Sequence, residues 1–334
     1  MLLARTSRAR WLADPSQVPP TRLFTVHLLT PAVYSEYATN FDAFMQHYYS
    51  RTSNHTVLLV SPQAHLKDAL DALSPMLGIR YSVRSNHAIR SSSTLLAWRH
   101  RSTNFLLQGI EMSVPERYNR MQATCGGRNW TQDYALYSGA IFVAQLLWQP
   151  ILDRATFYLK CDTDVRFVRP VPYDLSQRLG ELSKRVVLAH TGFEPGNNRD
   201  CERGIFQALA SFREGRIQRS HGGTKEMAHW CLAQKTTMTF YGNFLAFRAA
   251  WMRSTPIQRL SRYLYYERGE GYFQHRWGDQ ASPLAFLCHS LSKVALAGDE
   301  RIVHLQGLRC PGAASCTFRH GRAKRLQVPV VESR

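Results

Sequence analysis

The chain has 334 residues, of which 44% are hydrophobic and 20% charged, so it can bury a substantial core and extended disorder is excluded. Lys and Arg number 42 against 24 Asp and Glu, and the resulting net charge of +18 favours partners that carry phosphate. The basic residues are scattered and carry no RNA-binding signature, so no nucleic-acid partner is predicted. No stretch reaches the roughly 18 apolar residues of a membrane span, and no membrane anchor is visible in this chain.

The first part of the chain alternates short apolar runs with segments of helical periodicity. Residues 1–21 hold scattered arginines and end near two prolines, which predicts a flexible N-terminal tail. Five elements follow from apolar spacing: strands over 23–29, 56–60 and 79–83, and helices over 34–49 and 66–77. This strand–helix order predicts an α/β fold with a mainly parallel, Rossmann-like sheet flanked by helices.

Sheets of this kind bind ligands beyond the carboxyl ends of their strands. Thr30 directly follows the first strand and is a candidate contact for a nucleotide, the alternative being an ordinary residue of a β–α turn. Arg117 and Arg120 lie in a basic, aromatic segment and are candidates for bidentate pairing with a diphosphate. Solvated surface arginines are the alternative for both. A buried helix is predicted next, over 134–147.

The middle of the chain carries two carboxylates spaced i, i+2 at the end of an apolar run. The run Phe157–Leu159 predicts a buried strand, and Asp162 and Asp164 follow it directly. Two hard oxygen ligands suit Mn²⁺ or Mg²⁺ and leave other coordination positions for water and phosphate oxygens. We therefore treat both as candidate metal ligands, with Asp162 also contributing to donor binding. The alternative is a solvated turn, in which such pairs are common.

The second half contains a further strand, a long loop and a Gly-rich aromatic segment. A strand is predicted over 186–190, a long loop over 191–224 that would serve as an acceptor-side lid, a strand over 237–247, and helices over 251–266 and 281–290. Asp279 precedes the last helix, where it either caps the helix or faces an acceptor hydroxyl as a general base. His304 lies in a strand over 301–305 and is either a core residue or a third metal ligand.

Three segments together resemble the fungal-type α-1,2-mannosyltransferases in order and approximate spacing. They are Tyr158-Leu159-Lys160-Cys161-Asp162-Thr163-Asp164-Val165-Arg166-Phe167, Gly242-Asn243-Phe244 and Arg276-Trp277-Gly278-Asp279. The resemblance covers residues 22–310 and implies one GT-A-like catalytic domain with a smaller antiparallel acceptor-side portion, followed by a C-terminal tail over 311–334. It also implies Mn²⁺, a GDP-sugar donor and a place in the Golgi lumen or secretory pathway. By that similarity Asp162 and Asp164 match the family's acidic metal segment, and His304 its metal-binding histidine.

The chain departs from that family at three points. Asp162-Thr163 replaces the family's Glu-Pro, and His275 replaces a Glu. The family has a carboxylate shortly before its Asn-Phe that is proposed as a nucleophile, and Thr236–Tyr241 contain none, so no covalent intermediate is expected there. We expect a metal-dependent glycosyltransferase that moves a hexose, with mannose implied by the resemblance, from a GDP- or UDP-sugar to a glycan or glycoprotein hydroxyl. The alternative is a non-catalytic nucleotide-sugar or glycan-binding protein on the same fold.

Overall fold

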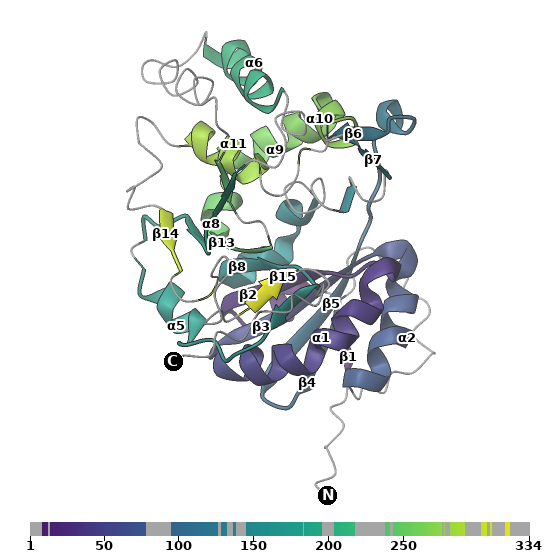
Figure 1. Ribbon diagram of the computed structural model, residues 1–334, viewed down its shortest axis with the longest axis vertical. Coiled ribbons are helices and arrows are strands. Elements are labelled where there is room, and N and C mark those ends of the chain that lie inside the picture. The colour runs from purple at the N-terminus through teal and green to yellow at the C-terminus, as the bar shows by residue number, and fades with distance from the viewer. Residues whose placement is uncertain are drawn as a thin grey trace, which may run out of the picture.

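The computed structural model describes most of the chain between residues 9 and 305 and two short pieces beyond (Figure 1). The described residues are 9–12, 14–77, 95–125, 128–131, 136–137, 145–182, 184–195, 204–217, 238–240, 243–275, 277, 281–290, 302–305, 308 and 318–320. Within them, no helix is both long enough and apolar enough to span a bilayer.

One large mixed sheet dominates the described part of the chain. Its strand order is β1-β4-β5-β3-β2-β8-β13-β10-β14. The bounds in that order are Arg10–Leu12, Leu95–His100, Thr103–Ile110, His55–Pro62, Thr21–Leu28, Ala155–Cys161, Phe244–Arg248, Leu188–His190 and Ile302–His304. The central strands β5, β3, β2 and β8 run parallel, whereas β13 pairs antiparallel with both of its neighbours. The sheet is therefore mainly parallel, as the sequence predicts, with antiparallel pairs on both sides of its centre, since β4 also pairs antiparallel with β1 and β5.

Helices cover both faces of this sheet (Figure 1). The α-helices are α1 Tyr34–His47, α2 Leu66–Leu77, α5 Leu175–Gly180, α6 Ile205–Ile217, α8 Ala249–Met252, α9 Thr255–Arg262, α10 Glu270–Phe273 and α11 Ala281–Ser290. The π-turn η10 spans Tyr263–Glu267, and 3₁₀ turns include η1 Pro15–Gln17, η2 Pro31–Val33, η3 Tyr49–Arg51, η4 Gln63–His65, η6 Glu116–Tyr118, η8 Leu146–Trp148 and η9 Pro150–Arg154. Short strand pairs are β6 Ala123–Cys125 with β7 Arg128–Trp130, β9 Val165–Phe167 with β15 Phe318–His320, and β11 Phe193–Pro195 with β12 Met238–Phe240.

The two faces of the sheet bury separate hydrophobic clusters. Phe44 of α1 and Leu70 of α2 pack on one face together with Leu159 of β8. Tyr158 of the same strand belongs to the cluster on the other face, which includes Leu260 of α9. Successive residues of a strand point to opposite faces, so β8 supplies both clusters in turn. Each fully buried side chain of this size contributes roughly 2 kcal/mol relative to exposure.

Most predicted elements are confirmed, and the differences lie in the second half of the chain. The helices α1, α2 and α11 and the strands β2, β3, β8, β10 and β14 lie where apolar spacing predicts them. The predicted strand over 237–247 is two strands, β12 and β13, and the predicted helix over 251–266 is divided into α8, α9 and η10. The segment 191–224 is not a loop throughout, because it contains β11 and α6. The predicted strand over 79–83 and most of the helix over 134–147 lie outside the described residues.

Candidate functional site

The candidate site is the carboxyl edge of the sheet, where β2, β8, β10 and β14 all end. Asp162 follows β8, which lies between β2 and β13. Asn243 precedes β13 and lies beside it, because the backbone N–H of Asp162 donates to the carbonyl of Asn243 at 3.0 Å. His190 ends β10, and His304 ends β14. The topology therefore brings to one edge side chains that are distant in sequence, which is where open α/β sheets bind ligands.

A tight turn after β8 presents the two aspartates. The N–H of Val165 donates to the carbonyl of Asp162 at 3.2 Å and closes the turn. Thr163, between the aspartates, is buried at 6% exposure, and its carbonyl accepts from Nδ2 of Asn40 in α1 at 2.9 Å. Asp162 and Asp164 are both half-buried. Anchoring of the middle residue thus leaves the two carboxylates at the surface of the edge, as a shared cation requires.

Lys160 is a site residue that sequence reasoning missed. It lies two residues before Asp162 on the same face of β8, and its side chain is only 4% exposed. Its Nζ donates to Oδ1 of Asp162, which is 33% exposed. A buried ammonium needs such a partner because removal from water costs several kcal/mol. One sequence signal was present: a single cation within an otherwise apolar strand, at i, i+2 from a carboxylate.

His304 lies at the same edge, further along the sheet. It pairs in register with His190, and the two imidazole centroids are 5.2 Å apart. Burial, with a smaller contribution from the neighbouring His304, lowers the pKa of His190 to about 4 against the opposing effect of a hydrogen bond with the Gly192 backbone. His190 is therefore neutral at pH 7. Because β13 and β10 separate β14 from β8, the backbones near Asp162 and His304 are about 14 Å apart at ordinary strand spacing.

Within the described residues, no group of three or more His, Cys, Asp or Glu is arranged to hold one metal ion. Asp162 and Asp164 lie together in one turn, whereas His304 reaches the same ion only if the loops after β8 and β14 bend toward each other. The donor set that fits a hard divalent cation here is the aspartate pair completed by water or phosphate oxygens. His304 stays a prediction as a third ligand.

Thr30 occupies the end of β2, next to β8. Val26 of β2 pairs in register with Lys160, so Thr30 lies just beyond the level of Asp162. Its side chain is 6% exposed and makes no capping hydrogen bond to η2, while its carbonyl accepts from the N–H of Val33 at 2.9 Å. The structure thus places Thr30 on the predicted edge, and its contact with a nucleotide stays a prediction.

Arg117 and Arg120 are both exposed and lie in or beside η6, apart from the aspartate turn. Tyr118 between them is buried and anchors this segment, because its hydroxyl accepts from the N–H of Gly269 at 2.9 Å. The guanidinium carbon of Arg117 lies 4.7 Å from the centre of the Tyr118 ring. The segment therefore presents two exposed cations beside an anchored tyrosine, and their pairing with phosphate stays a prediction.

The Gly-rich aromatic segment packs around Trp277. This side chain is 1% exposed, its backbone N–H donates to the carbonyl of Gly271 at 2.7 Å, and its ring lies edge-on to Tyr272 at 5.8 Å. A Cβ on Gly271 would lie 2.0 Å from the indole, so only glycine fits there. Asp279, two residues beyond, lies outside the described residues, and its role stays a prediction.

Comparison with known proteins shows the fold. No family model matches the sequence, and neither does any curated protein. Among solved structures, the mannosyltransferase Ktr4p from S. cerevisiae matches with a TM-score of 0.55 and 12% identity, over 82% of this chain and 70% of that chain. Its complex with GDP matches with a TM-score of 0.53 and 13% identity, over 81% and 67%.

Core-mannan synthase A (CmsA/Ktr4) from Aspergillus fumigatus, in its Mn/GDP form, matches with a TM-score of 0.54 and 10% identity, over 83% of this chain and 72% of that chain. Structural matches at identities this low show a shared fold alone, so the activity has to be argued from the site itself. With its mainly parallel sheet, antiparallel flank and acidic turn after β8, the chain has the GT-A fold of these mannosyltransferases.

Proposed function

We propose that this protein is a metal-dependent glycosyltransferase that moves a hexose from a nucleotide-diphosphate sugar to a hydroxyl of a glycan or glycoprotein. The observation that carries the proposal is the pair of half-buried carboxylates, Asp162 and Asp164, on an anchored turn at the carboxyl end of β8. The GT-A fold supports it, since structural neighbours with this fold were solved with GDP and with Mn. Mannose and GDP are the sugar and nucleotide that we propose to test first.

Asp162 and Asp164 would hold Mn²⁺ or Mg²⁺, which as a Lewis acid stabilises the charge of a leaving diphosphate. The buried Lys160 donates to Oδ1 of Asp162, so this carboxylate is already oriented before the sugar donor binds. Arg117 and Arg120 would approach the diphosphate from the η6 side and share its negative charge. Thr30 would contact the nucleotide at the end of β2. Asp279 would face the acceptor hydroxyl as general base or orient it.

Calorimetric titration tests the donor site directly. GDP and UDP are titrated with and without Mn²⁺ into the wild type, into Asp162→Ala/Asp164→Ala, and into Asp71→Asn as a control on exposed α2. We expect Mn²⁺-dependent binding of one nucleotide that is lost in the double variant and kept in the control. Undiminished binding in the double variant would refute the proposed site. The nucleotide that binds names the donor base.

Two single variants test the proposed roles of Asp279 and His304. Asp279→Asn should lower turnover of the nucleotide sugar while leaving nucleotide affinity unchanged, as expected for a group that acts on the acceptor. His304→Ala should weaken Mn²⁺ binding if the loops close to bring the imidazole to the ion. Unchanged Mn²⁺ affinity in that variant would remove His304 from the ligand set and leave the aspartate pair.

A non-catalytic nucleotide-sugar-binding protein is the second candidate. The observation that favours it is the ion pair between Lys160 and Asp162, which already compensates one of the two carboxylates that a catalytic metal needs. This candidate requires nucleotide binding with no release of nucleoside diphosphate from GDP- or UDP-sugars, with or without glycan acceptors. Release that depends on Mn²⁺ and on Asp164 would exclude it.

A further inference from the structure

A cavity of about 810 Å³ opens at the amino ends of the central strands. This is the opposite edge of the sheet from the aspartate turn, because β2, β3 and β5 begin here and end there. Its walls come from β1, the end of β4, the turn η3 and the starts of β2, β3 and β5. We call it the amino-edge pocket. Its size falls within the range of about 300–1,000 Å³ typical of small-molecule sites.

Arginines dominate the charge of the amino-edge pocket. Arg10 of β1, Arg51 of η3 and Arg99 of β4 line it, and all three are exposed. Within the described residues none of the three forms an ion pair. Asp174 is the carboxylate in the lining, and it already accepts from the N–H groups of Ser53 at 2.9 Å and Gln177 at 3.1 Å. The lining thus holds three arginines and one committed carboxylate, and this excess of positive charge favours an anionic ligand.

The other titratable groups of the lining do not change this balance. Burial lowers the pKa of His55 to about 3, against a small opposing effect of Asp174, so its imidazole is neutral. Burial would raise the pKa of Asp174, but the hydrogen bonds from Ser53 and Gln177 outweigh it and lower that pKa, so the carboxylate stays ionised. Burial raises the pKa of the Tyr49 phenol, which stays neutral. The positive charge of the pocket therefore comes from arginine and persists across neutral pH.

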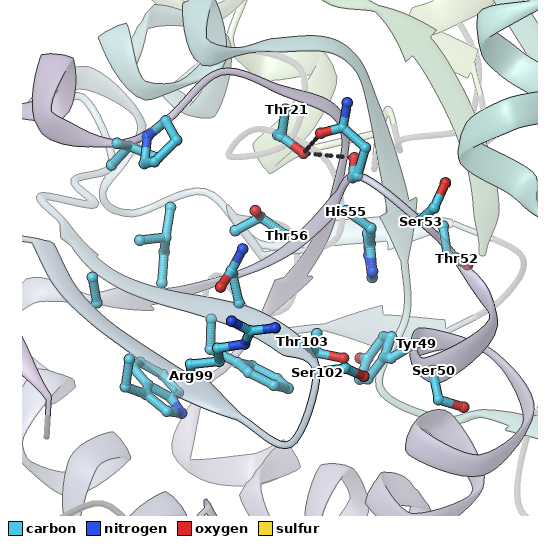
Figure 2. Close-up of a pocket in the computed structure, with 18 of the residues that line it drawn as sticks. Thr21, Tyr49, Ser50, Thr52, Ser53, His55, Thr56, Arg99, Ser102 and Thr103 are labelled. Carbon is cyan, nitrogen blue, oxygen red and sulfur yellow. Dashed lines mark hydrogen bonds between the residues drawn. The ribbon is translucent and has the colours of Figure 1, made fainter. Parts of the chain in front are cut away.

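Hydroxyl groups line the space between the arginines. Figure 2 shows Thr21 and Thr56 on one side of the pocket, Arg99 and Thr103 facing them, and further hydroxyls along the remaining edge from Ser50, Thr52, Ser53 and Ser102. Thr21 and Thr52 are committed, because their hydroxyls donate to the carbonyls of Asn54 at 2.7 Å and of Tyr48 at 3.0 Å. Trp98 and Phe105, stacked at 5.5 Å, are 5% and 0% exposed and pack in the core beneath this lining. Hydroxyl groups beside arginines suit a polyhydroxylated molecule that carries negative charge.

We propose that the amino-edge pocket binds a sugar phosphate, with the arginines pairing the phosphate and the Ser, Thr and Asn104 side chains bonding the sugar hydroxyls. A phosphate matches the surplus of guanidinium groups, because it accepts bidentate pairs from more than one arginine. The site is separate from the donor site at the other edge of the sheet. Its occupancy does not depend on Asp162 or Asp164, and it stands or falls independently of the proposed function.

Titration of simple sugar phosphates tests this assignment. Glucose 6-phosphate, mannose 6-phosphate and ribose 5-phosphate, with inorganic phosphate and glucose as reference probes, are titrated into the wild type and into Asp162→Ala/Asp164→Ala. We expect at least one sugar phosphate to bind both proteins equally, and more tightly than inorganic phosphate or glucose. Arg51→Gln/Arg99→Gln should lower that affinity about tenfold or more, at roughly 1.4 kcal/mol per tenfold. Arg259→Gln, an exposed arginine on α9, is the matched control and should bind as the wild type does.

Four results would overturn the proposal. They are no binding of any sugar phosphate at millimolar concentration, loss of binding in Asp162→Ala/Asp164→Ala, equal affinity for inorganic phosphate or glucose, and no effect of Arg51→Gln/Arg99→Gln. Both substituted arginines are exposed, so the variant keeps its fold, which its unfolding transition verifies. Unchanged binding of GDP with Mn²⁺ in the arginine variant would separate the two sites.

Discussion

Nζ of Lys160 donates to Oδ1 of Asp162, two residues further along the chain, and so links the interior of the sheet to the edge that carries the aspartate turn. The lysine side chain is 4% exposed and the aspartate side chain 33%, so the pair has one end in the core and one in water. Removal of the lysine therefore leaves a carboxylate that water can still solvate. This asymmetry allows the positive charge to be removed without leaving an uncompensated buried ion.

Lys160→Met should bind Mn²⁺ more tightly than the wild type in the absence of nucleotide, by about an order of magnitude, because a cation next to the proposed ligand is removed. The free energy of unfolding should change by less than about 1 kcal/mol, since Met fills a similar apolar volume. Electron paramagnetic resonance of free Mn²⁺ and urea unfolding measure the two effects. Lys67→Met, which removes an exposed ion pair with Asp71, is the control. Weaker Mn²⁺ binding would contradict this prediction and show that the orientation of Asp162 by Lys160 outweighs the repulsion between Lys160 and the ion.

Arg117→Gln and Arg120→Gln should each lower the affinity for the nucleotide diphosphate about tenfold when measured with Mn²⁺, if they pair with the phosphates. The loss should shrink with added salt, because both side chains are exposed and their charges are screened. Arg178→Gln on α5, about as exposed, is expected to leave the affinity unchanged. If all three variants bound the nucleotide with the affinity of the wild type, both η6 arginines would be ordinary surface residues.

Gly271→Ala should destabilise the fold by about 3 kcal/mol, because the added Cβ would lie 2.0 Å from the buried Trp277 ring. Gly180→Ala is the matched control. There the nearest atom, at 2.7 Å, is Cδ of Arg22, within a flexible side chain that can move aside. Its free energy of unfolding should stay within about 1 kcal/mol of the wild type. Urea unfolding of the two variants measures the difference, and equal stabilities would contradict the packing described around Trp277.

Stability should fall on acidification because buried histidines resist protonation. Burial lowers the pKa of both His27 and His55 from 6.5 to about 3, so between these values the unfolded chain binds protons that the folded chain does not. The stabilisation is complete above pH 6.5 and is lost as the pH falls toward 3, by up to about 1.4 kcal/mol per pH unit for each histidine.

His27→Gln keeps a partner for the Tyr49 hydroxyl, which lies 2.6 Å from Nε2 of His27, and removes one of these groups. The slope of unfolding free energy against pH below about pH 6 should be shallower in this variant by roughly 1.4 kcal/mol per unit. Gln207→Ala, at an exposed position of α6, removes no titratable group and should keep the wild-type slope. A slope in His27→Gln equal to that of the wild type would show that His27 is protonated in the folded state.

Several features of the site could be predicted from local sequence because they depend on neighbours along the chain. The apolar run Phe157–Leu159 placed Asp162 and Asp164 at the end of a buried strand, and the strand–helix order placed Thr30 at the same edge. The hairpin formed by β4 and β5 was not anticipated, because its pairing joins the sheet between β1 and β3 and depends on long-range contacts. Helix α6 was expected as loop, since its many polar residues obscure its apolar face.

The sequence by itself determined the elements and the acidic turn, because the apolar periodicities of strands (two residues) and helices (3.6 residues) can be seen in consecutive residues. Only the tertiary structure decided which elements are neighbours. It set His304 beside His190 across a parallel register, three strand spacings from β8. It buried Lys160 beneath Asp162, and it assembled Arg10, Arg51 and Arg99 from separate elements around one pocket. Such juxtapositions follow from strand order and from the packing of elements that are distant in sequence, which no local pattern specifies.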